Sequence, residues 1–214
     1  MNLLNVNMTR EMRCVMCITC LYLYVTLGEW FIHKHVMHNE EFDPGHIRHH
    51  KSVNIDMTLD DDEFIEDDIQ MGSQHTIMIT MGTACISNVI INKIFEMDIS
   101  KYNIIMGSIL LALFYKVMWN KYHRKMHFES EFFEKTANPY LKWIYFNHSI
   151  HHLQKGVLKG NYNILFPGGD HIMGDYRTIV DNTTYCYEDK LNNICKHSKV
   201  FDKIPKKINI IEKE

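Results

Sequence analysis

Residues 14–38 read CVMCITCLYLYVTLGEWFIHKHVMH, a long apolar run that ends in three histidines. The run from 14 to 32 would be about 28 Å long as a helix, close to the ~30 Å hydrocarbon thickness of a bilayer. No small-residue cleavage site of a secretory signal follows it, and it leads directly into the histidines. We therefore predict a retained membrane-spanning helix whose end carries histidines at the membrane surface.

Two more apolar stretches follow, at residues 76–95 and 104–119, and a short polar turn at 96–103 separates them. This pattern predicts an apolar hairpin. Its second arm is short for a complete crossing, so a tilted or re-entrant pair stays open as an alternative. If the first helix crosses once and the hairpin returns, residues 33–75 and 120–214 emerge on the same side of the membrane.

Basic residues near the helix ends favour a cytosolic position for the histidines, because cytoplasmic segments carry an excess of Lys and Arg. An endoplasmic reticulum-like membrane agrees with this orientation. The side with the histidines has Lys34, Arg48, Lys51, Lys121, Arg124 and Lys125, and the opposite side has Arg10, Arg13, Lys93 and Lys101.

Composition narrows the class of protein. The net charge of -3 gives no basic footprint for nucleic acid. Cys14, Cys17 and Cys20 lie along one side of the first apolar helix, and we interpret them as packing residues rather than a metal site. The acidic segment 56–68 lacks the alternating oxygens and central glycine of a calcium loop, so it is interpreted as a solvated loop.

The histidines carry the strongest chemical signal. Imidazole is the commonest side-chain metal ligand, whereas histidine is an indifferent helix former. Residues three or four apart project from one face of a helix, so each cluster can aim two or three ring nitrogens at one point or at two nearby metals. Ten ligands exceed the needs of one ion, and we predict two. Ten of the fourteen histidines fall into four clusters: His33 with His38; His46, His49 and His50; His123 with His127; and His148, His151 and His152.

The first cluster is irregular. His33 and His38 are five residues apart, roughly 140° around an ideal helix, so they need different metals or a locally unwound turn. His35 competes with them as a ligand on geometry alone. Of the three remaining histidines, His75 and His197 are taken as ordinary surface or core residues, and His171 is left open.

The second ring nitrogen of a metal-bound histidine needs a hydrogen-bond acceptor. Glu29 lies one turn before His33, Glu129 lies close after His127, and Asp170 follows the last cluster. We expect these carboxylates to orient the rings. Imidazole suits iron, zinc, copper and nickel, so the spacing alone leaves the metal open.

The complete set of motifs resembles the fatty acid hydroxylase / sterol desaturase superfamily, and its spelling is most similar to that of the fatty acid 2-hydroxylases. The resemblance covers about residues 27–177. The chain is accordingly divided into a polar lead at 1–13, a membrane domain at 14–177 and a polar tail at 178–214. The matching segments are Glu29 to His33 and on to His38, His46 to His50, His123 to His127, His148 to His152, Gly160 to Asn163, Gly169 with Asp170, and Gly174 to Tyr176.

The resemblance implies an all-α integral membrane helical bundle with a cytosolic, histidine-rich helical cap that holds a dinuclear metal site. It implies a di-iron oxygenase that hydroxylates a fatty acyl chain, sphingolipid, sterol or carotenoid with O2 and two external electrons. A cytochrome b5-type or ferredoxin-type protein would supply the electrons, and zinc can replace iron in the purified protein. At least eight of the ten histidines would bind directly; Glu29 and Asp170 would orient them, and Asn161 and Tyr162 would shape the lid of the site.

Three alternatives stay open. A lipid desaturase would use the same metal centre and remove a second hydrogen instead of transferring oxygen. A metal transporter or storage protein would place its ligands near the bilayer midplane. A structural zinc module would hold one redox-inert ion.

Overall fold

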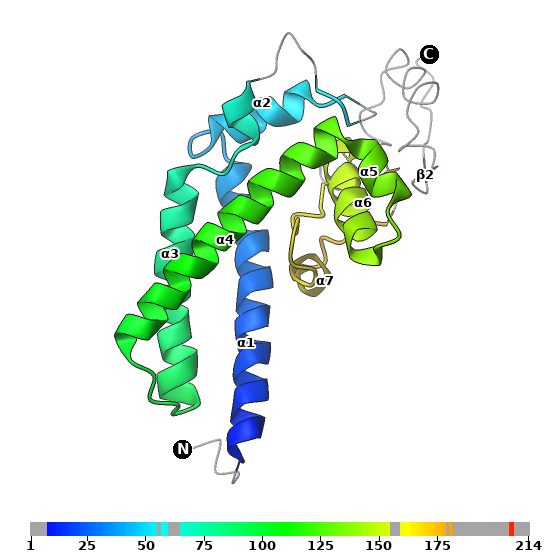
Figure 1. Ribbon diagram of the computed structural model, residues 1–214. Coiled ribbons are helices and arrows are strands. Elements are labelled where there is room, and N and C mark those ends of the chain that lie inside the picture. Colours follow the sequence, from blue (N-terminus) through cyan, green and yellow to red (C-terminus); the bar gives the residue numbers. More distant parts are fainter. Residues whose placement is uncertain are drawn as a thin grey trace, which may run out of the picture.

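The computed structural model describes residues 8–54, 57–59, 65–154, 159–178, 180–181 and 206–207. Three long helices form a narrow leg, and shorter helices gather at one end of the leg as a wider cap (Figure 1). Within the described residues the only strands are β1 (Val180–Asp181) and β2 (Lys206–Lys207), which pair in parallel. The predicted all-helical class is confirmed.

Helix α1 (Arg10–Phe31) begins at Thr9, whose hydroxyl accepts a hydrogen bond from the N–H of Met12 at 3.3 Å. The helix continues without a break as the π-helix η1 (Ile32–Met37). Together they form a segment that is long and apolar enough to cross a membrane. The sequence prediction of one long apolar helix that ends in histidines is confirmed.

The hairpin consists of α3 (Ser73–Asn88), its π-helical extension η3 (Val89–Ile94), and α4 (Lys101–Phe128). The side chain of Asn92 closes its tip, because its oxygen accepts from the N–H of Ile99 at 2.8 Å and its amide donates to the carbonyl of the same residue at 2.7 Å. Arg13 donates to the carbonyl of Phe95 at 3.2 Å, so the tip lies beside the beginning of α1.

Helix α4 is longer than the apolar stretch that predicts it. Beyond Trp119 it extends through Lys121 and Arg124 to Phe128, because lysine and arginine are good helix formers and their stems cover apolar surface. The arm is therefore long enough to cross a membrane, as are Arg10–Met37 and Glu66–Ile94. Whether the hairpin spans or re-enters stays a prediction.

The cap consists of α2 (Pro44–Ser52), the 3-10 helix η2 (Glu66–Ile69), α5 (Ser130–Lys135), α6 (Pro139–Leu153) and α7 (Gly169–Met173). Both histidine-bearing cap helices start on a side-chain cap followed by proline, which suits the first helical position. Asp43 accepts from the N–H of His46 in α2, and Asn138 accepts from the N–H of Tyr140 in α6.

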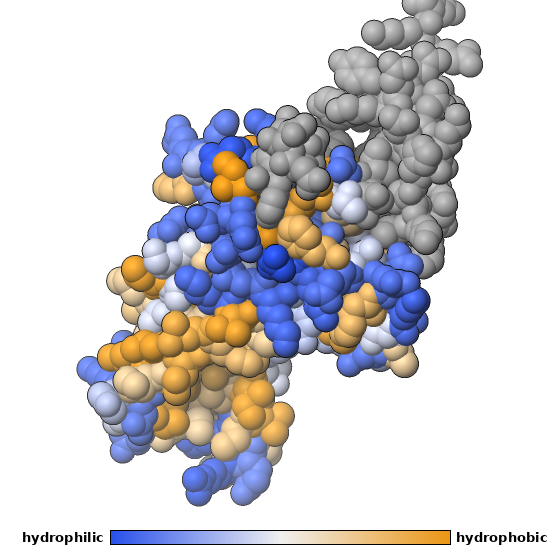
Figure 2. Space-filling model, turned by 45° about the horizontal axis from the view of Figure 1, so that its top comes forward, coloured by the Kyte–Doolittle hydropathy of each residue, from blue (hydrophilic) through white to orange (hydrophobic). Residues whose placement is uncertain are grey.

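The surface separates into two zones. Apolar side chains gather on the long helices, whereas polar side chains dominate the wide end (Figure 2). The exposed apolar residues on the leg include Ile18, Met81, Leu110 and Val117, each more than half exposed. Large apolar patches of this kind mark contact with lipid or with another protein. The buried core lies nearer the cap, around Trp119.

Candidate metal centre

The ten clustered histidines converge inside the cap, at the junction with the leg. Nine of them are buried, and His38 is partly buried. They form two groups, and within each group the candidate ligand nitrogens all lie within 4.8 Å of one another. The first group is His33, His38, His46, His50 and His151, and the second group is His49, His123, His127, His148 and His152.

Helices α2 and α6 each serve both groups. In α2, His46 and His50 are four residues apart and share the first group, whereas His49 joins the second. In α6 the pair four apart, His148 and His152, joins the second group. Neighbouring positions on a helix point in different directions, so the His-x-x-His-His spelling divides its rings between two adjacent sites.

The π-helix η1 resolves the five-residue separation in the first cluster. The N–H of His38 donates to the carbonyl of His33 at 3.1 Å, the i→i+5 bond of a π-turn. The wider turn stacks the two rings: their centroids lie 5.1 Å apart, and the ring planes are inclined by 27°. The turn is thus locally widened, and both histidines belong to one group rather than to different metals.

Backbone carbonyls orient the rings. In the first group, Nδ1 of His33 lies 2.6 Å from the carbonyl of Tyr162, and Nδ1 of His151 lies 2.7 Å from that of Gly160. A carbonyl only accepts, so each Nδ1 carries the proton and each Nε2 presents a lone pair to the group.

The second group repeats this arrangement. Nδ1 of His123 lies 2.8 Å from the carbonyl of Ile69, and Nδ1 of His127 lies 2.8 Å from that of Met57. Each group therefore has at least two Nε2 lone pairs that are fixed from behind.

Within each group, Nε2 atoms of different rings lie close together. The Nε2 atoms of His33 and His46 are 3.1 Å apart, and those of His127 and His148 are 3.2 Å apart. Within the described part of the chain, both ring nitrogens of His49 and Nε2 of His123 are buried without a hydrogen-bond partner. Buried acceptors that converge in this way are costly unless a cation lies between them.

The spacing suits a shared ion. Two nitrogens that each lie about 2.0–2.1 Å from one metal are roughly 3 Å apart. The donor set, five imidazoles in each group, therefore fits two transition-metal ions, and it leaves the identity of the metal open.

Protonation favours ligation as well. Burial, the largest cause, lowers the pKa of all seven clustered histidines that lie outside the three long apolar segments, and neighbouring positive groups lower it further. The neutral imidazole, which binds metal, is therefore the resident form at neutral pH. These seven cap histidines are His38, His46, His49, His50, His148, His151 and His152.

Glu29 is buried but contacts none of the ten rings. Its carboxylate accepts the N–H groups of Leu165 and Phe166 and the hydroxyl of Tyr115, each at 2.8 Å, and the amide of Asn163 at 3.2 Å. No hydrogen bond from Glu29 to a ring is described, and its expected role in orienting the rings stays a prediction. Glu29 holds a distant loop against α1.

Asp170 acts on the rings through the backbone. Its two oxygens accept the N–H groups of Tyr162 and Asn163 at 2.8 Å, and the carbonyl of Tyr162 in turn accepts from His33. Burial raises the pKa of Asp170 to about 6 although these two donors lower it, so the group is ionised at pH 7. Glu129 pairs with Lys125 at 3.1 Å, and no bond to a ring is described for it.

Tyr162 packs on rings of the first group, and Asn161 holds the chain beside it. Asn161 is buried with φ of 59°, and its side chain holds the backbone of Arg177 at 2.6 and 2.9 Å. The ring of Tyr162 lies 5.3 Å from that of His151 and 5.7 Å from that of His33. Burial raises the pKa of Tyr162 to about 12, so its hydroxyl stays protonated.

The remaining histidines stand apart from both groups. His35 is exposed against Trp30, with ring centroids 5.3 Å apart, and His171 stacks on Tyr176 at 3.8 Å. His75 is buried with Nε2 3.4 Å from Asp43. His197 lies outside the described residues.

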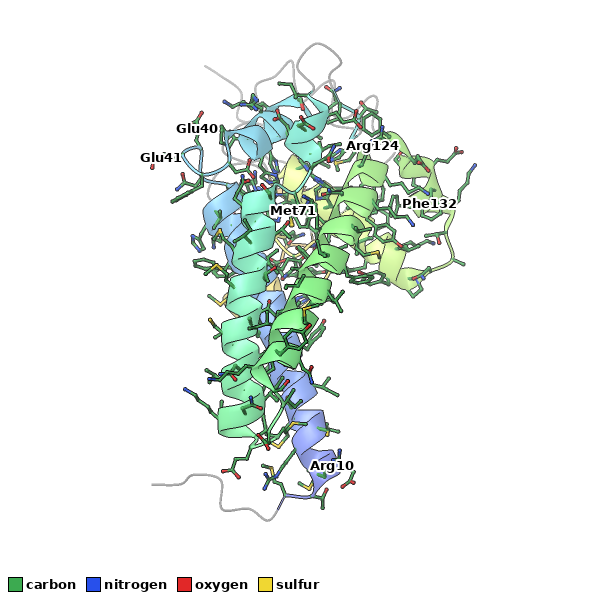
Figure 3. The ribbon with its side chains drawn as sticks, turned by 60° about the vertical axis from the view of Figure 1, so that its left-hand side comes forward. Arg10, Glu40, Glu41, Met71, Arg124 and Phe132 are labelled. Carbon is green, nitrogen blue, oxygen red and sulfur yellow. The ribbon has the colours of Figure 1, made fainter. Side chains whose placement is uncertain are left out.

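Three contacts had no signal in the sequence. Met57, Ile69 and Gly160 contribute backbone carbonyls, which any residue has. Lys159, whose Nζ lies 3.3 Å from Nδ1 of His50, is a fourth neighbour. Met71, a pocket residue, lies between the upper ends of α3 and α4 (Figure 3).

A pocket runs along the inner faces of α1, α3 and α4 and reaches the first group. Its cavity volume is about 60 Å³, within about 580 Å³ of non-atom space that includes open solvent. His33 is the one member of the ten that lines it, together with Gly28, Met78, Leu111 and Trp119. Most of its lining is apolar.

No protein-family model, curated protein or solved structure matches this chain. Function therefore has to be inferred from the site itself.

Proposed function

We propose that this chain is a membrane di-iron oxygenase that hydroxylates a lipid with O2 and two external electrons. The observation that carries the proposal is the pair of five-histidine groups beside an apolar pocket. The spelling of the histidine motifs, which resembles that of the fatty acid hydroxylase / sterol desaturase superfamily, supports iron and lipid chemistry.

The pocket supports a long apolar substrate. Small-molecule sites are concave and mostly apolar, with a few polar groups that fix orientation. This pocket lies between helices that are apolar enough to cross a membrane, and His33 of the first group is one of its lining residues. A fatty acyl chain, sphingolipid, sterol or carotenoid that enters from the bilayer would thus reach the first group.

Each group of five imidazoles would hold one iron ion. The metal pair, when bound, supplies the activation of O2 that breaks an unactivated C–H bond. The residues of this chain keep the Nε2 lone pairs aimed inward, because the carbonyls behind His33, His151, His123 and His127 fix their tautomers. Burial of the rings excludes water from the site.

The electrons would come from a cytochrome b5-type or ferredoxin-type protein at the cytosolic face of an endoplasmic reticulum-like membrane. Glu40, Glu41 and Arg124 mark the outer edge of the cap, at the opposite end of the molecule from Arg10 (Figure 3). The buried rings lie inside this edge, so electrons would enter through the cap.

A lipid desaturase with the same metal centre is the nearest alternative. A non-catalytic metal transporter fits less well, because such proteins bind their ions near the bilayer midplane. Here the rings lie where the long helices enter the cap, and His33 is near the end of its apolar segment. One inert zinc per chain would instead favour a structural module.

Mass spectrometry of lipids from cells that express the chain tests the proposal. A gain of one oxygen in a lipid class indicates hydroxylation, and a loss of two hydrogens indicates desaturation. His148→Ala with His151→Ala removes one ring from each group and should abolish the product. His35→Ala is the matched control, because His35 is exposed and outside both groups, and it should keep the product. Lipids that are identical in all three cell lines would contradict catalysis.

A further inference from the structure

Helix α7, which packs against α1, and the first turn of α6 expose apolar side chains. These two stretches, residues 139–143 and 169–173, are together called the shelf. Tyr140, Ile172 and Met173 are 41%, 56% and 47% exposed. Within these two described stretches, Lys142 is the one exposed side chain with a permanent charge. The shelf is thus an apolar, weakly basic surface on the cap.

Hydrogen bonds between the shelf and α1 fix the position of the shelf along the axis of α1. The hydroxyl of Tyr22 donates to the carbonyl of Pro167 at 2.7 Å, and the hydroxyl of Thr26 accepts from the N–H of Gly169 at 2.7 Å. Thr26 lies about 10 Å below His33 along the helix axis, at about 1.5 Å per residue. Accordingly, α7 lies beside the upper part of α1 and well below α2 (Figure 1).

This depth overlaps the apolar layer of the leg. If the shelf lay wholly in water, only residues 10–21 of α1 would be left for the membrane, roughly 18 Å against a hydrocarbon thickness of ~30 Å. Exposed apolar side chains also continue up α1 beyond the shelf, to Phe31, which is 53% exposed. The boundary of the bilayer therefore lies above Thr26, and the shelf lies within the same layer.

We propose that the shelf inserts into the headgroup–acyl boundary of the bilayer as a monotopic element, without crossing it. Its residue types suit that position, since tyrosine and tryptophan are enriched at membrane interfaces and lysine extends its ammonium group to the headgroups. Tyr140 and Trp143 stack with ring centroids 6.3 Å apart, and Lys142 lies between them in the sequence. Insertion of 5–10 Å is typical for such elements.

The insertion also bears on the pocket. Tyr140 in the shelf donates to the carbonyl of Leu165 at 2.8 Å, and the next residue, Phe166, lines the pocket. The lipid surface thereby helps to hold one wall of the pocket. This inference rests on the membrane placement in the proposed function but not on the proposed metal chemistry.

Photo-crosslinking of the unmodified chain tests the insertion. The chain is reconstituted in vesicles whose phospholipids carry a diazirine on the acyl chain near the headgroup, irradiated and digested. We expect lipid adducts on the shelf, residues 139–143 and 169–173, as well as on α1. Helix α5 is the control, because Phe132 is as exposed as Tyr140, at 41%, but lies in the cap away from α1. Adducts on α1 with none on the shelf would overturn the inference alone, whereas no adducts on α1 would also overturn the membrane placement.

Nitroxide accessibility gives a second measurement. A spin label at Ile172→Cys, in a chain whose six native cysteines are replaced by serine, should be relaxed more by O2 than by a water-soluble nickel complex. A label at Glu131→Cys in α5 should show the reverse. Metal content equal to that of the native chain verifies folding. A label at 172 that behaves like the label at 131, or is shielded from both reagents by a second copy of the chain, would contradict insertion into lipid.

Discussion

Gly28 gives the sharpest test of the pocket as the lipid site. It lines the pocket beside Glu29, and a Cβ added there would meet no atom within 4 Å. Replacement by leucine would place four carbons in the proposed path of an acyl chain, and the first of them, Cβ, meets no atom. The substitution would displace about four methylenes of substrate, each worth about 0.8 kcal/mol on burial, so about 3 kcal/mol of binding is lost. We expect kcat/KM to fall roughly 100- to 200-fold, at about 1.4 kcal/mol per factor of ten.

Gly107→Leu is the matched control. Gly107 lies on α4 with the same open space around its Cβ, but it is exposed and does not line the pocket. Both substitutions replace a helical glycine, which favours folding by up to about 1 kcal/mol. The assay measures oxidised lipid per bound metal in vesicles. Equal rates for Gly28→Leu and Gly107→Leu, with equal metal content, would refute the assignment of the pocket to the substrate.

Other substitutions and conditions test the supports of the site. Glu29→Ala leaves three donors without an acceptor, the hydroxyl of Tyr115 and the N–H groups of Leu165 and Phe166. It should lower the unfolding temperature in detergent by more than Glu29→Gln, since each buried unsatisfied donor costs about 1–3 kcal/mol; equal melting of the two variants would contradict this. Asp170→Ala should reduce metal in the first group more than in the second, because Asp170 holds the backbone behind His33; an equal loss from both groups, by X-ray absorption and metal analysis, would argue against that path. The metal-free chain should lose stability as the pH falls through about 6.5, because the seven cap histidines have a lowered pKa when folded and the unfolded chain then binds more protons. The free energy of unfolding should fall by about 1.4 kcal/mol per pH unit for each histidine that protonates only on unfolding. A melting temperature that is flat from about pH 7.5 to 5.5 would count against buried neutral rings.

The local pattern of the sequence predicts the helices and the convergence of the rings well. Apolar runs of sufficient length predict α1 and the hairpin, and the four-residue spacings within α2, α4 and α6 predict which rings share a group. The histidines three residues apart in α2 and α6 are instead divided between the two groups. These features depend on residues within a few turns of one another. For that reason they are visible in the sequence.

The features that the sequence did not predict depend on distant backbone. The π-turn between His33 and His38 adds one residue to a helical turn. The roughly 3.6-residue periodicity of an α-helix does not predict this addition. The acceptors behind the rings are carbonyls, such as that of Met57 for His127, 70 positions away in the sequence, rather than the expected carboxylates. The bonds from Glu29 to the N–H groups of residues 165 and 166 were likewise not predicted, because only the folded chain brings these residues together.

Metal content and coordination test the paired centre most directly. The chain, purified in mild detergent after growth with iron, should bind two metal ions, and X-ray absorption should give nitrogen-only ligation with imidazole scattering. His35→Ala should keep both ions, whereas His148→Ala with His151→Ala should lose metal from both groups. A native chain with one ion or none, or with sulfur in the coordination shell, would contradict two five-histidine sites.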